Sequence, residues 1–489
     1  MRLQQPIIKY LWLILIFCPT LVVAEITTFA ISNAPNSLHP ILASDASSER
    51  INALIYQPII ELDENDRPIS GLTDITQHDA QHYSLVLSSS KHRFSNNADV
   101  SLLDIEASLN LARNHPRSPQ AQTLSNIASI ETTEKSILIS LKKPDYRFAE
   151  KLHISVAPKE MLLKDETLTQ HPIGSGVFEW VRTQGDGGVT LRHRKSSEEI
   201  RFVVNKDPTM RVLKLLKGEA SILQNDLPHE MYRLLKDDLN ILVTQTPGTT
   251  FSYLGFNMAD PVLKRPEIRQ AIAFAINRQA IVKHLFQENA QLANTLLAPG
   301  HWAAHPTLPA YEHSPEKAKQ LLATLGYSHQ NPLELSYKTS TDPFRLRIAA
   351  VFQQQLREVG INLKIQSYEW GSFFGDIKAG RFQLYSLSWV GIRSPDVFRY
   401  VYHSDSLPPS GANRGRYISN EVDQLIEQAE ELPLEKSLPL YRKIQEKIHR
   451  DLVYVPLWHE DQIVASRRGD LKPNKHGSYQ YLERAFDQH

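Results

Sequence analysis

The chain has 489 residues, which is too long for one hydrophobic core, so two or three domains are expected. Hydrophobic residues make up 41% of the chain and charged residues 22%, values typical of a soluble globular protein. The 54 basic and 54 acidic side chains cancel, and this neutrality argues against a nucleic-acid-binding role, which needs a basic surface.

The first 24 residues have the pattern of a cleaved secretory signal peptide. Arg2 and Lys9 give a positive start, residues 11–17 form an unbroken apolar run, and Val22 and Ala24 place small side chains at a cleavage site. The apolar stretch of about 15 residues is shorter than the ~20 residues that cross a bilayer. This length favours cleavage and export over an uncleaved N-terminal anchor.

The single cysteine, Cys18, lies inside this leader. A lipidated cysteine follows small residues, whereas Ile16 and the bulky Phe17 precede this one, so lipidation is the less favoured alternative. After cleavage the mature chain has no cysteine, and therefore no disulfide and no thiolate metal ligand. Its stability then depends on packed cores.

The mature chain begins with a short strand, a turn-rich segment and a helix. Residues 26–31 predict the strand, and Ser, Asn and Pro fill the turn-rich residues 32–40. Ile51, Leu54 and Ile55 then lie on one face of a helix.

A hairpin, a strand and a helix are predicted next. Residues 61–68 predict a hairpin turn, and residues 82–88 alternate as a half-buried strand does. Ser101 has the position of a helix cap, with Asp104 third in that helix, which together form a capping box.

The clearest helix follows Pro266. Its apolar residues step by three and four positions, which predicts one amphipathic helix: Ile268, Ala271, Ile272, Ala275, Ile276 and later Leu285. Further elements are predicted as helices at 314–326, 343–360 and 373–379 and as strands at 361–365 and 382–390. Strands that alternate with helices of this length indicate α/β lobes.

Motifs of enzyme chemistry are absent: the sequence has no GxxxxGK phosphate loop, no GxSxG elbow and no HExxH zinc helix. Gly174-Ser175-Gly176 is interpreted as a turn between lobes, because one serine between two glycines is a weak sign of a nucleophile. His229 and His459 lack a second histidine four residues on, so metal-ligand spacing fails. A hydrolase whose catalytic residues are distant in sequence stays open as an alternative.

Five short segments occur in a fixed order along the mature chain. They are LHP at 38–40, IYQPIIELD at 55–63, PIGSGVF at 172–178, FN at 256–257 with PEIRQAIAFAINR at 266–278, and SW at 388–389 with NRGRY at 413–417 before Asp423. In this order they resemble the family 5 extracellular solute-binding proteins, the dipeptide, oligopeptide and nickel-complex receptors of ABC importers. The segment at 266–278 is the most specific of the five.

The resemblance implies an α/β fold of the type II, cluster C, periplasmic binding protein kind: two lobes joined by a hinge, an additional small domain and a ligand cleft between the lobes. Lobe I would comprise residues 25–55, 170–250 and 466–489. The small domain would comprise residues 56–169, and lobe II residues 251–465.

The resemblance also implies a function: the periplasmic, substrate-binding component of an ABC importer, which captures a peptide or peptide-like solute and delivers it to the inner-membrane permease. We expect a monomer that is not an enzyme and carries no cofactor and no metal. Two alternatives stay open, a secreted hydrolase acting on peptides and the ligand-sensing domain of a regulator. Related solute-binding regions occur behind DNA-binding modules, although the leader stands in that place here.

Eight residues are the candidate ligand-binding residues: Ser32, Asn33, Tyr253, Asn257, Trp389, Arg393, Asp396 and Arg414. We expect about half of them to touch ligand, because pockets use few polar anchors. Trp389, beside a strand end, suits a ligand platform but could belong to the core. Asn257 could instead fix hinge backbone, and Arg414 could cap a helix or pair on the surface.

Two segments depart from the resemblance. Residues 94–98 replace an "HDG" segment, a loop change expected to lie far from the pocket. Peptide receptors of the family also have an aspartate shortly after the tryptophan, in "W..DY.DP", which holds the peptide ammonium. Residues 389–396 read WVGIRSPD, with Ile392 and Arg393 in that neighbourhood.

An arginine at this place would repel an ammonium and grip a carboxylate or phosphate. We therefore expect an anionic group on the ligand, contacted by Arg393. The alternative is that Arg393 pairs with Asp396 or points into water. Whether the ligand is a peptide, a metal chelate or another anionic solute stays open.

Overall fold

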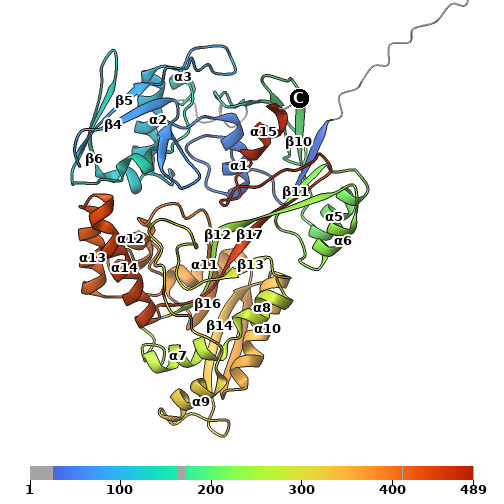
Figure 1. Ribbon diagram of the computed structural model, residues 1–489, viewed down its shortest axis with the longest axis vertical. Coiled ribbons are helices and arrows are strands. Elements are labelled where there is room, and N and C mark those ends of the chain that lie inside the picture. Colours follow the sequence, from blue (N-terminus) through green and yellow to red (C-terminus); the bar gives the residue numbers. More distant parts are fainter. Residues whose placement is uncertain (1–25, 163–170, 410, 488–489) are drawn as a thin grey trace, which may run out of the picture.

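The computed structural model describes residues 26–162, 171–409 and 411–487, so the predicted leader and Cys18 lie outside the described residues. Figure 1 shows two bodies, one above the other, joined by long strands. The upper body holds the elements predicted for lobe I and the small domain, and the lower body those predicted for lobe II. We keep these three names for the groups of elements below. No described helix is both long and apolar enough to cross a membrane.

Lobe I is built on the strand predicted at residues 26–31. This strand, β1, pairs in parallel with β10 on one side and β11 on the other, so that Phe29 lies opposite Phe202 and Ile222. The helix with Ile51, Leu54 and Ile55 is confirmed as α1, and the Asp45 side chain caps it by accepting from the Ser48 amide at 3.0 Å. The elements of lobe I are β1 (Thr27–Ile31), α1 (Ala46–Ile55), β8 (Phe178–Thr183), β9 (Val189–His193), β10 (Glu199–Val204), α5 (Pro208–Leu216), β11 (Ile222–Gln224), α6 (Met231–Asp237) and α15 (Tyr481–Asp487).

The small domain contains a four-stranded antiparallel sheet in the order β4-β5-β7-β6. The predicted capping box is confirmed: the amide of Ser101 donates to Asp104 Oδ2 at 2.9 Å at the start of α2. The predicted hairpin is also present, as β2 and β3. The elements are β2 (Ile60–Leu62), β3 (Pro68–Ser70), β4 (Thr73–Gln77), β5 (His82–Leu87), α2 (Leu102–Asn114), η1 (Thr123–Asn126), β6 (Ile127–Thr132), β7 (Ile137–Leu141), η2 (Phe148–Leu152) and α3 (Lys159–Leu162).

Lobe II has three parallel strands in the order β15-β14-β16, with helices around them. The predicted helix at 343–360 ends at Arg357, and Gly360 has a φ of 91°, a conformation that glycine adopts without strain. The elements are α7 (Pro266–Ala275), α8 (Arg278–His284), β13 (Ala290–Leu292), α9 (Pro315–Ala323), β14 (Leu333–Ser340), α10 (Pro343–Arg357), β15 (Ile361–Tyr368), α11 (Trp370–Ala379), β16 (Leu384–Trp389), α12 (Val397–Tyr402), α13 (Asn420–Glu430) and α14 (Leu434–Asp451).

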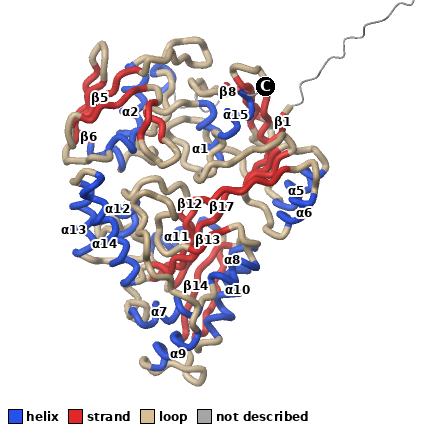
Figure 2. Tube along the Cα trace, viewed as in Figure 1, coloured by secondary structure: helices blue, strands red, loops and turns tan. Residues whose placement is uncertain are grey.

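Two long strands, β12 (Leu242–Phe256) and β17 (Tyr454–Ser466), run through both bodies as an antiparallel pair. They join the two sheets into one of eleven strands, because β17 also pairs with β11 of lobe I and β12 with β16 of lobe II. Figure 2 shows the pair as a continuous red diagonal. The pairing is irregular between Thr246 and Thr250, which places a local break in the ladder close to the predicted boundary at residue 250.

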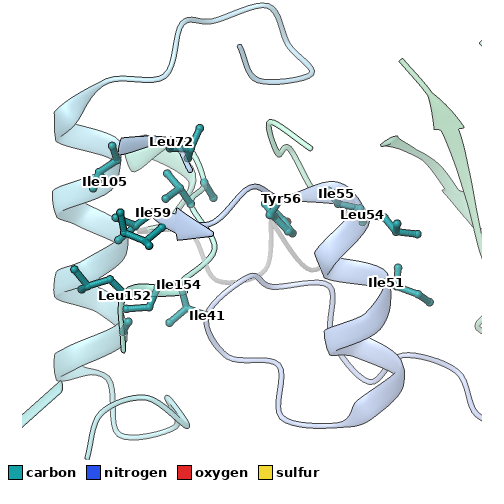
Figure 3. Packing of buried hydrophobic residues seen from close by; sticks show 14 of the residues in the cluster. Ile41, Ile51, Leu54, Ile55, Tyr56, Ile59, Leu72, Ile105, Leu152 and Ile154 are labelled. Carbon is teal, nitrogen blue, oxygen red and sulfur yellow. The ribbon is translucent and has the colours of Figure 1, made fainter. Parts of the chain in front are cut away.

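The sheet runs through both bodies, whereas the hydrophobic cores named below each lie in one of them. One core cluster contains Phe29 and Leu54 of lobe I together with Leu85 and Leu109 of the small domain. Figure 3 shows this core reaching from α1 to the helix that carries Ile105. Two other clusters lie within lobe II, around α7 to α10 and around α11 to α14. Lobe I and the small domain therefore form one packed body, and lobe II a second.

The helix predicted to run from Pro266 to Leu285 is wrong as one element. It is two helices, α7 and α8, because the Asn277 side chain accepts from the Ala280 amide at 2.9 Å and so begins a new helix. Asparagine competes with helical backbone hydrogen bonds and favours such caps.

The arginines of this segment are structural. Arg269 is 3% exposed and donates to the carbonyls of Leu263 at 2.7 Å and Asp451 at 2.6 Å. Arg278 is 4% exposed and donates to the carbonyls of Ala293 and Pro456, each at 2.6 Å. The most specific segment of the sequence therefore holds lobe II together.

The glycine-serine-glycine turn packs against the C-terminal end of α1, inside the upper body. The Gly176 amide donates to the Ile55 carbonyl at 2.8 Å, and a Cβ added to Gly174 would lie 2.1 Å from that same oxygen. Ser175 between them is 6% exposed. The turn needs glycine for close backbone contact.

Candidate functional site

The candidate site lies where β16 ends and faces the upper body. In open α/β sheets, ligands bind outside the carboxyl ends of the strands. β16 ends at Trp389, a loop of residues 390–396 follows, and α12 begins at Val397. Figure 1 shows α12 directly beneath the small domain. We call residues 390–396 the site loop.

Three of the predicted residues meet at this edge: Trp389, Arg414 and Tyr253. The Arg414 guanidinium carbon lies 4.4 Å from the centre of the Trp389 ring, a cation–π contact, and its Nη1 donates to the Tyr253 hydroxyl at 3.4 Å. Tyr253 is fully buried and stacks on Tyr454 at 4.1 Å. Trp389 therefore presents its ring beside a fixed arginine, while Tyr253 belongs to the core and reaches the site through its hydroxyl alone.

Aromatic rings extend this arrangement, and sequence reasoning missed them. Phe374 also contacts Arg414, with its ring centre 5.4 Å from the guanidinium carbon, and Trp370 stacks on Phe374 at 5.5 Å. Trp370 is 55% exposed. The Trp389 Nε1 atom is buried and has no hydrogen-bond partner in the part of the chain that the structure describes. A buried donor without a partner is costly, so this N–H is available to a ligand acceptor.

Arg393, in the site loop, is half-buried. Within residues 26–162, 171–409 and 411–487, its guanidinium has neither a hydrogen bond nor an ion pair to a protein group. Burial lowers the pKa of Arg393, and the charges of Asp66, Glu61 and Glu49 oppose that shift. These carboxylates come from α1 and the β2–β3 hairpin, so acidic groups of the upper body act on the charge of Arg393.

Asp396 makes contacts of a different kind. Its Oδ1 accepts from Arg147 Nη2, and its Oδ2 lies 3.0 Å from Lys151 Nζ, both on the small domain. Burial raises the pKa of Asp396, but the charges of Arg147 and Lys151 outweigh it and hold that pKa well below its usual range. The alternative in which Arg393 pairs with Asp396 is not what the structure shows, because Asp396 is bound to these two cations.

Ser32 and Asn33 follow β1 in lobe I. Ser32 Oγ donates to Asp226 Oδ2 at 3.2 Å, and Asn33 Nδ2 donates to Ser32 Oγ at 3.2 Å. Asp226 comes shortly after β11, the neighbour of β1. Its carboxylate therefore lies beside Ser32, where these two strands end. Sequence reasoning missed Asp226 because its place depends on the pairing of β1 with β11.

Asn257 lies apart from the other candidates. The register pairs Phe251 with Trp389 and Phe256 with Leu384, so Asn257 comes at the opposite end of β16 from Trp389. Its Nδ2 donates to the carbonyls of Gly380 at 3.2 Å and Phe382 at 2.9 Å. These bonds fix lobe II backbone just before β16, whereas the alternative given above for this residue was hinge backbone.

A polar cluster beside Trp389 was also missed. Ser252 Oγ lies 2.7 Å from Ser388 Oγ and donates to Glu460 Oε1 at 2.7 Å, and Arg345 Nη2 lies 3.5 Å from the same carboxylate. The residues come from β12, β16, β17 and α10, so only the folded sheet brings them together. Ser388 next to Trp389 was the one available signal.

The chain is similar to known proteins over most of its length. Residues 89–410 match the model of the bacterial extracellular solute-binding proteins, family 5 Middle. The dipeptide-binding protein of Pseudomonas aeruginosa is 27% identical over 358 residues, which are 68% of this chain and 67% of that protein.

Solved structures share the fold. NikZ from Campylobacter jejuni in complex with Ni(L-His) superposes with a TM-score of 0.81 at 21% identity, covering 95% of this chain and 99% of that one. A dipeptide-binding protein from Pseudoalteromonas sp. SM9913 in complex with Met-Leu gives 0.79 at 21% identity, covering 92% and 98%. The two-lobed α/β fold predicted from the sequence is confirmed, and the chain belongs to family 5 of the bacterial extracellular solute-binding proteins.

Proposed function

We propose that the protein captures a peptide or peptide-like solute between lobe I and lobe II in the periplasm and delivers it to an inner-membrane ABC permease. The observation that carries this proposal is Arg393, a half-buried cation of the site loop without a protein partner among the described residues. An unpaired, half-buried charge is costly, and a ligand anion would complete it.

The clamp would close about β12 and β17, at the irregular pairing between Thr246 and Thr250. Two bodies with separate cores, joined by two strands, suit a hinge motion. Ligand bound between them would stabilise the closed form, which is the form a permease would recognise. We propose lobe I as residues 25–55, 170–250 and 466–489, the small domain as 56–169 and lobe II as 251–465.

A peptide carries a carboxylate at one end and an ammonium at the other. Arg393 would hold the carboxylate, and the Trp389 ring and its Nε1 would contact the body of the solute. Glu49 and Glu61 of the upper body, which act on the charge of Arg393, are the carboxylates we propose for an ammonium of the solute.

Relatives named as binding proteins support capture without turnover, so we propose that the protein is not an enzyme. One solved neighbour holds Met-Leu and another Ni(L-His), so peptides and a metal chelate are the two ligand classes to compare. Among the described residues, no group of three or more histidine, cysteine, aspartate or glutamate side chains could hold a metal ion.

The proposal is tested by titrating Met-Leu, Ala-Asp and nickel–histidine into the purified mature protein while intrinsic fluorescence is recorded. A peptide should change the fluorescence through Trp389 and saturate at one molecule per chain. Chromatography of the same mixtures after prolonged incubation should return the peptides intact. Saturation by nickel–histidine alone would show that the ligand is a metal chelate and not a peptide. Time-dependent cleavage of the peptides would favour a hydrolase.

A further inference from the structure

We propose that Arg147 and Lys151 of the small domain are positioning residues: through Asp396 they hold the site loop of lobe II in place when the clamp is closed. This inference rests on the proposed capture of a solute by closure. It gives the small domain a part in ligand binding, although it offers no side chain to the solute.

The contacts form one buried cluster. Arg147 donates through Nη2 to Asp396 Oδ1 and through Nη1 to the Tyr441 hydroxyl, and its guanidinium carbon lies 4.9 Å from the Tyr441 ring. Lys151 Nζ lies 3.0 Å from Asp396 Oδ2 and 2.7 Å from Asp145 Oδ2. The Arg147 side chain is 6% exposed and that of Asp396 is 23% exposed.

This degree of burial separates the cluster from an ordinary surface pair. Exposed ion pairs contribute ~0–1 kcal/mol and many contribute nothing. A buried pair behaves otherwise, because removing one partner leaves the other charge unpaired in a poorly solvated place. Asp396 therefore has a strong preference for the conformation in which Arg147 and Lys151 reach it.

The cluster connects two bodies whose cores are separate. Phe148 and Leu152, which directly follow Arg147 and Lys151 in the sequence, are buried in the core shared by lobe I and the small domain. Phe398 and Tyr441, beside Asp396 and Arg147, are buried in a core of lobe II. The polar contacts thus lie between two apolar cores, and opening of the lobes would break them without disturbing either core.

The cluster also fixes the site loop. That loop is held at one end by Trp389 on β16 and at the other by Asp396, the residue before α12. Arg393 lies between these ends, with its carbonyl 3.0 Å from His301 Nε2. Loss of the contacts between Asp396 and the small domain would release one end of this loop, which links closure to the position of the ligand-binding cation.

The test compares Arg147→Met, Asp396→Asn and a matched control, Arg93→Met. Arg93 pairs with Asp99 at 2.9 Å on the surface of the small domain, with side chains 55% and 73% exposed. Two readouts are taken: the dissociation constant for Met-Leu, and the distance distribution between spin labels at Lys135→Cys and Lys443→Cys. The mature chain has no other cysteine, so both labels are specific.

We expect Arg147→Met and Asp396→Asn to weaken Met-Leu binding by ~5–150-fold, the usual range of coupling between sites. Their label distances without ligand should become longer and broader, whereas Arg93→Met should match the parent. Arg147→Lys should restore part of the affinity. A thermal melt identifies any variant that fails to fold, and the variants that do fold then test the positioning role.

Unchanged affinity and unchanged distances in folded Arg147→Met and Asp396→Asn would overturn the inference. If Met-Leu does not bind the parent protein, the proposed function fails in its peptide part. The label distances without ligand still test the cluster in that case, so the two failures are distinguishable.

Discussion

The Arg414 guanidinium carbon lies 4.4 Å from the centre of the Trp389 ring and 5.4 Å from that of the Phe374 ring. The sequence separates Trp389 and Arg414 by 24 intervening residues, and the fold brings them together at the end of β16. Arg414 also donates to the Tyr253 hydroxyl, whereas the Arg393 guanidinium has no protein partner among the described residues. Arg393 is therefore the first candidate for the ligand anion.

Replacement of Arg414 by leucine should leave the anion site intact and loosen the Trp389 ring. We expect a loss of ~0.5–2 kcal/mol in the free energy of unfolding, the value of a cation–π contact. Urea unfolding and the emission spectrum of the parent and variant provide the measurement. Arg357→Leu, at an exposed position of α10, is the control and should change neither. Equal stability of Arg414→Leu and the parent would show that the contact between Arg414 and the Trp389 ring does not stabilise the protein.

Replacement of Arg393 by alanine should weaken the binding of an anionic solute. A charge-assisted hydrogen bond contributes about 1.5–3 kcal/mol, so calorimetry should show a loss of that size. Arg393→Lys should keep part of the affinity, because it retains the charge but not the two-pronged donor geometry. Affinity that is unchanged in the alanine variant would place Arg393 on the surface.

Glu150 should make stability depend on pH. Burial raises the pKa of Glu150 to about 7, the charge of Asp396 adds to the rise, and Arg147, Lys151 and a hydrogen bond from Ser394 oppose it. The pKa in the folded protein therefore lies above the ordinary value of 4.5. The contribution of Glu150 to the free energy of unfolding is therefore fully present below pH 4.5 and is lost as the pH rises through about 7.

Urea unfolding at pH 5, 6, 7 and 8 tests this dependence in the parent and in Glu150→Gln. The glutamine cannot ionise, so the parent should lose stability relative to the variant between pH 5 and pH 8. Parallel curves for the two proteins would show that Glu150 titrates with an ordinary pKa.

The close contact between Gly174 and α1 can be tested by substitution, with Gly185 as the control. A Cβ on Gly174 would meet the Ile55 carbonyl oxygen at 2.1 Å, whereas nothing lies within 4 Å of a Cβ on Gly185. Gly174→Ala should therefore lower the melting temperature or prevent folding, since backbone would have to move. Gly185→Ala should melt like the parent, and equal melting of both variants would contradict the packing of this turn.

Local patterns in the sequence predicted much of the fold. The β1 strand, the capping box of Ser101 and the helix that begins at Pro343 depend on neighbouring residues and are confirmed, although this helix ends at Arg357, three residues before Gly360. The break between α7 and α8 was missed because the apolar spacing continues across Asn277, whose capping role depends on its own side chain.

The candidate site was less predictable, because its contacts are distant in sequence. Asp396 is 249 residues from Arg147, and Ser252 is 208 residues from Glu460. No periodicity or motif indicates such pairs. Trp389, Arg393 and Arg414 were found from resemblance, whereas Asn257 belongs to a turn of lobe II, and ligand contact by the eight candidates stays a prediction.

The central claim is that the chain carries a solute. Mass spectrometry of small molecules released from gently purified protein, by denaturation after extensive washing, tests it most directly. The account predicts an intact peptide or peptide-like solute with an anionic group, near one per chain in the parent and depleted in Arg393→Ala. A parent protein that releases no solute and binds none of a dipeptide library would contradict it.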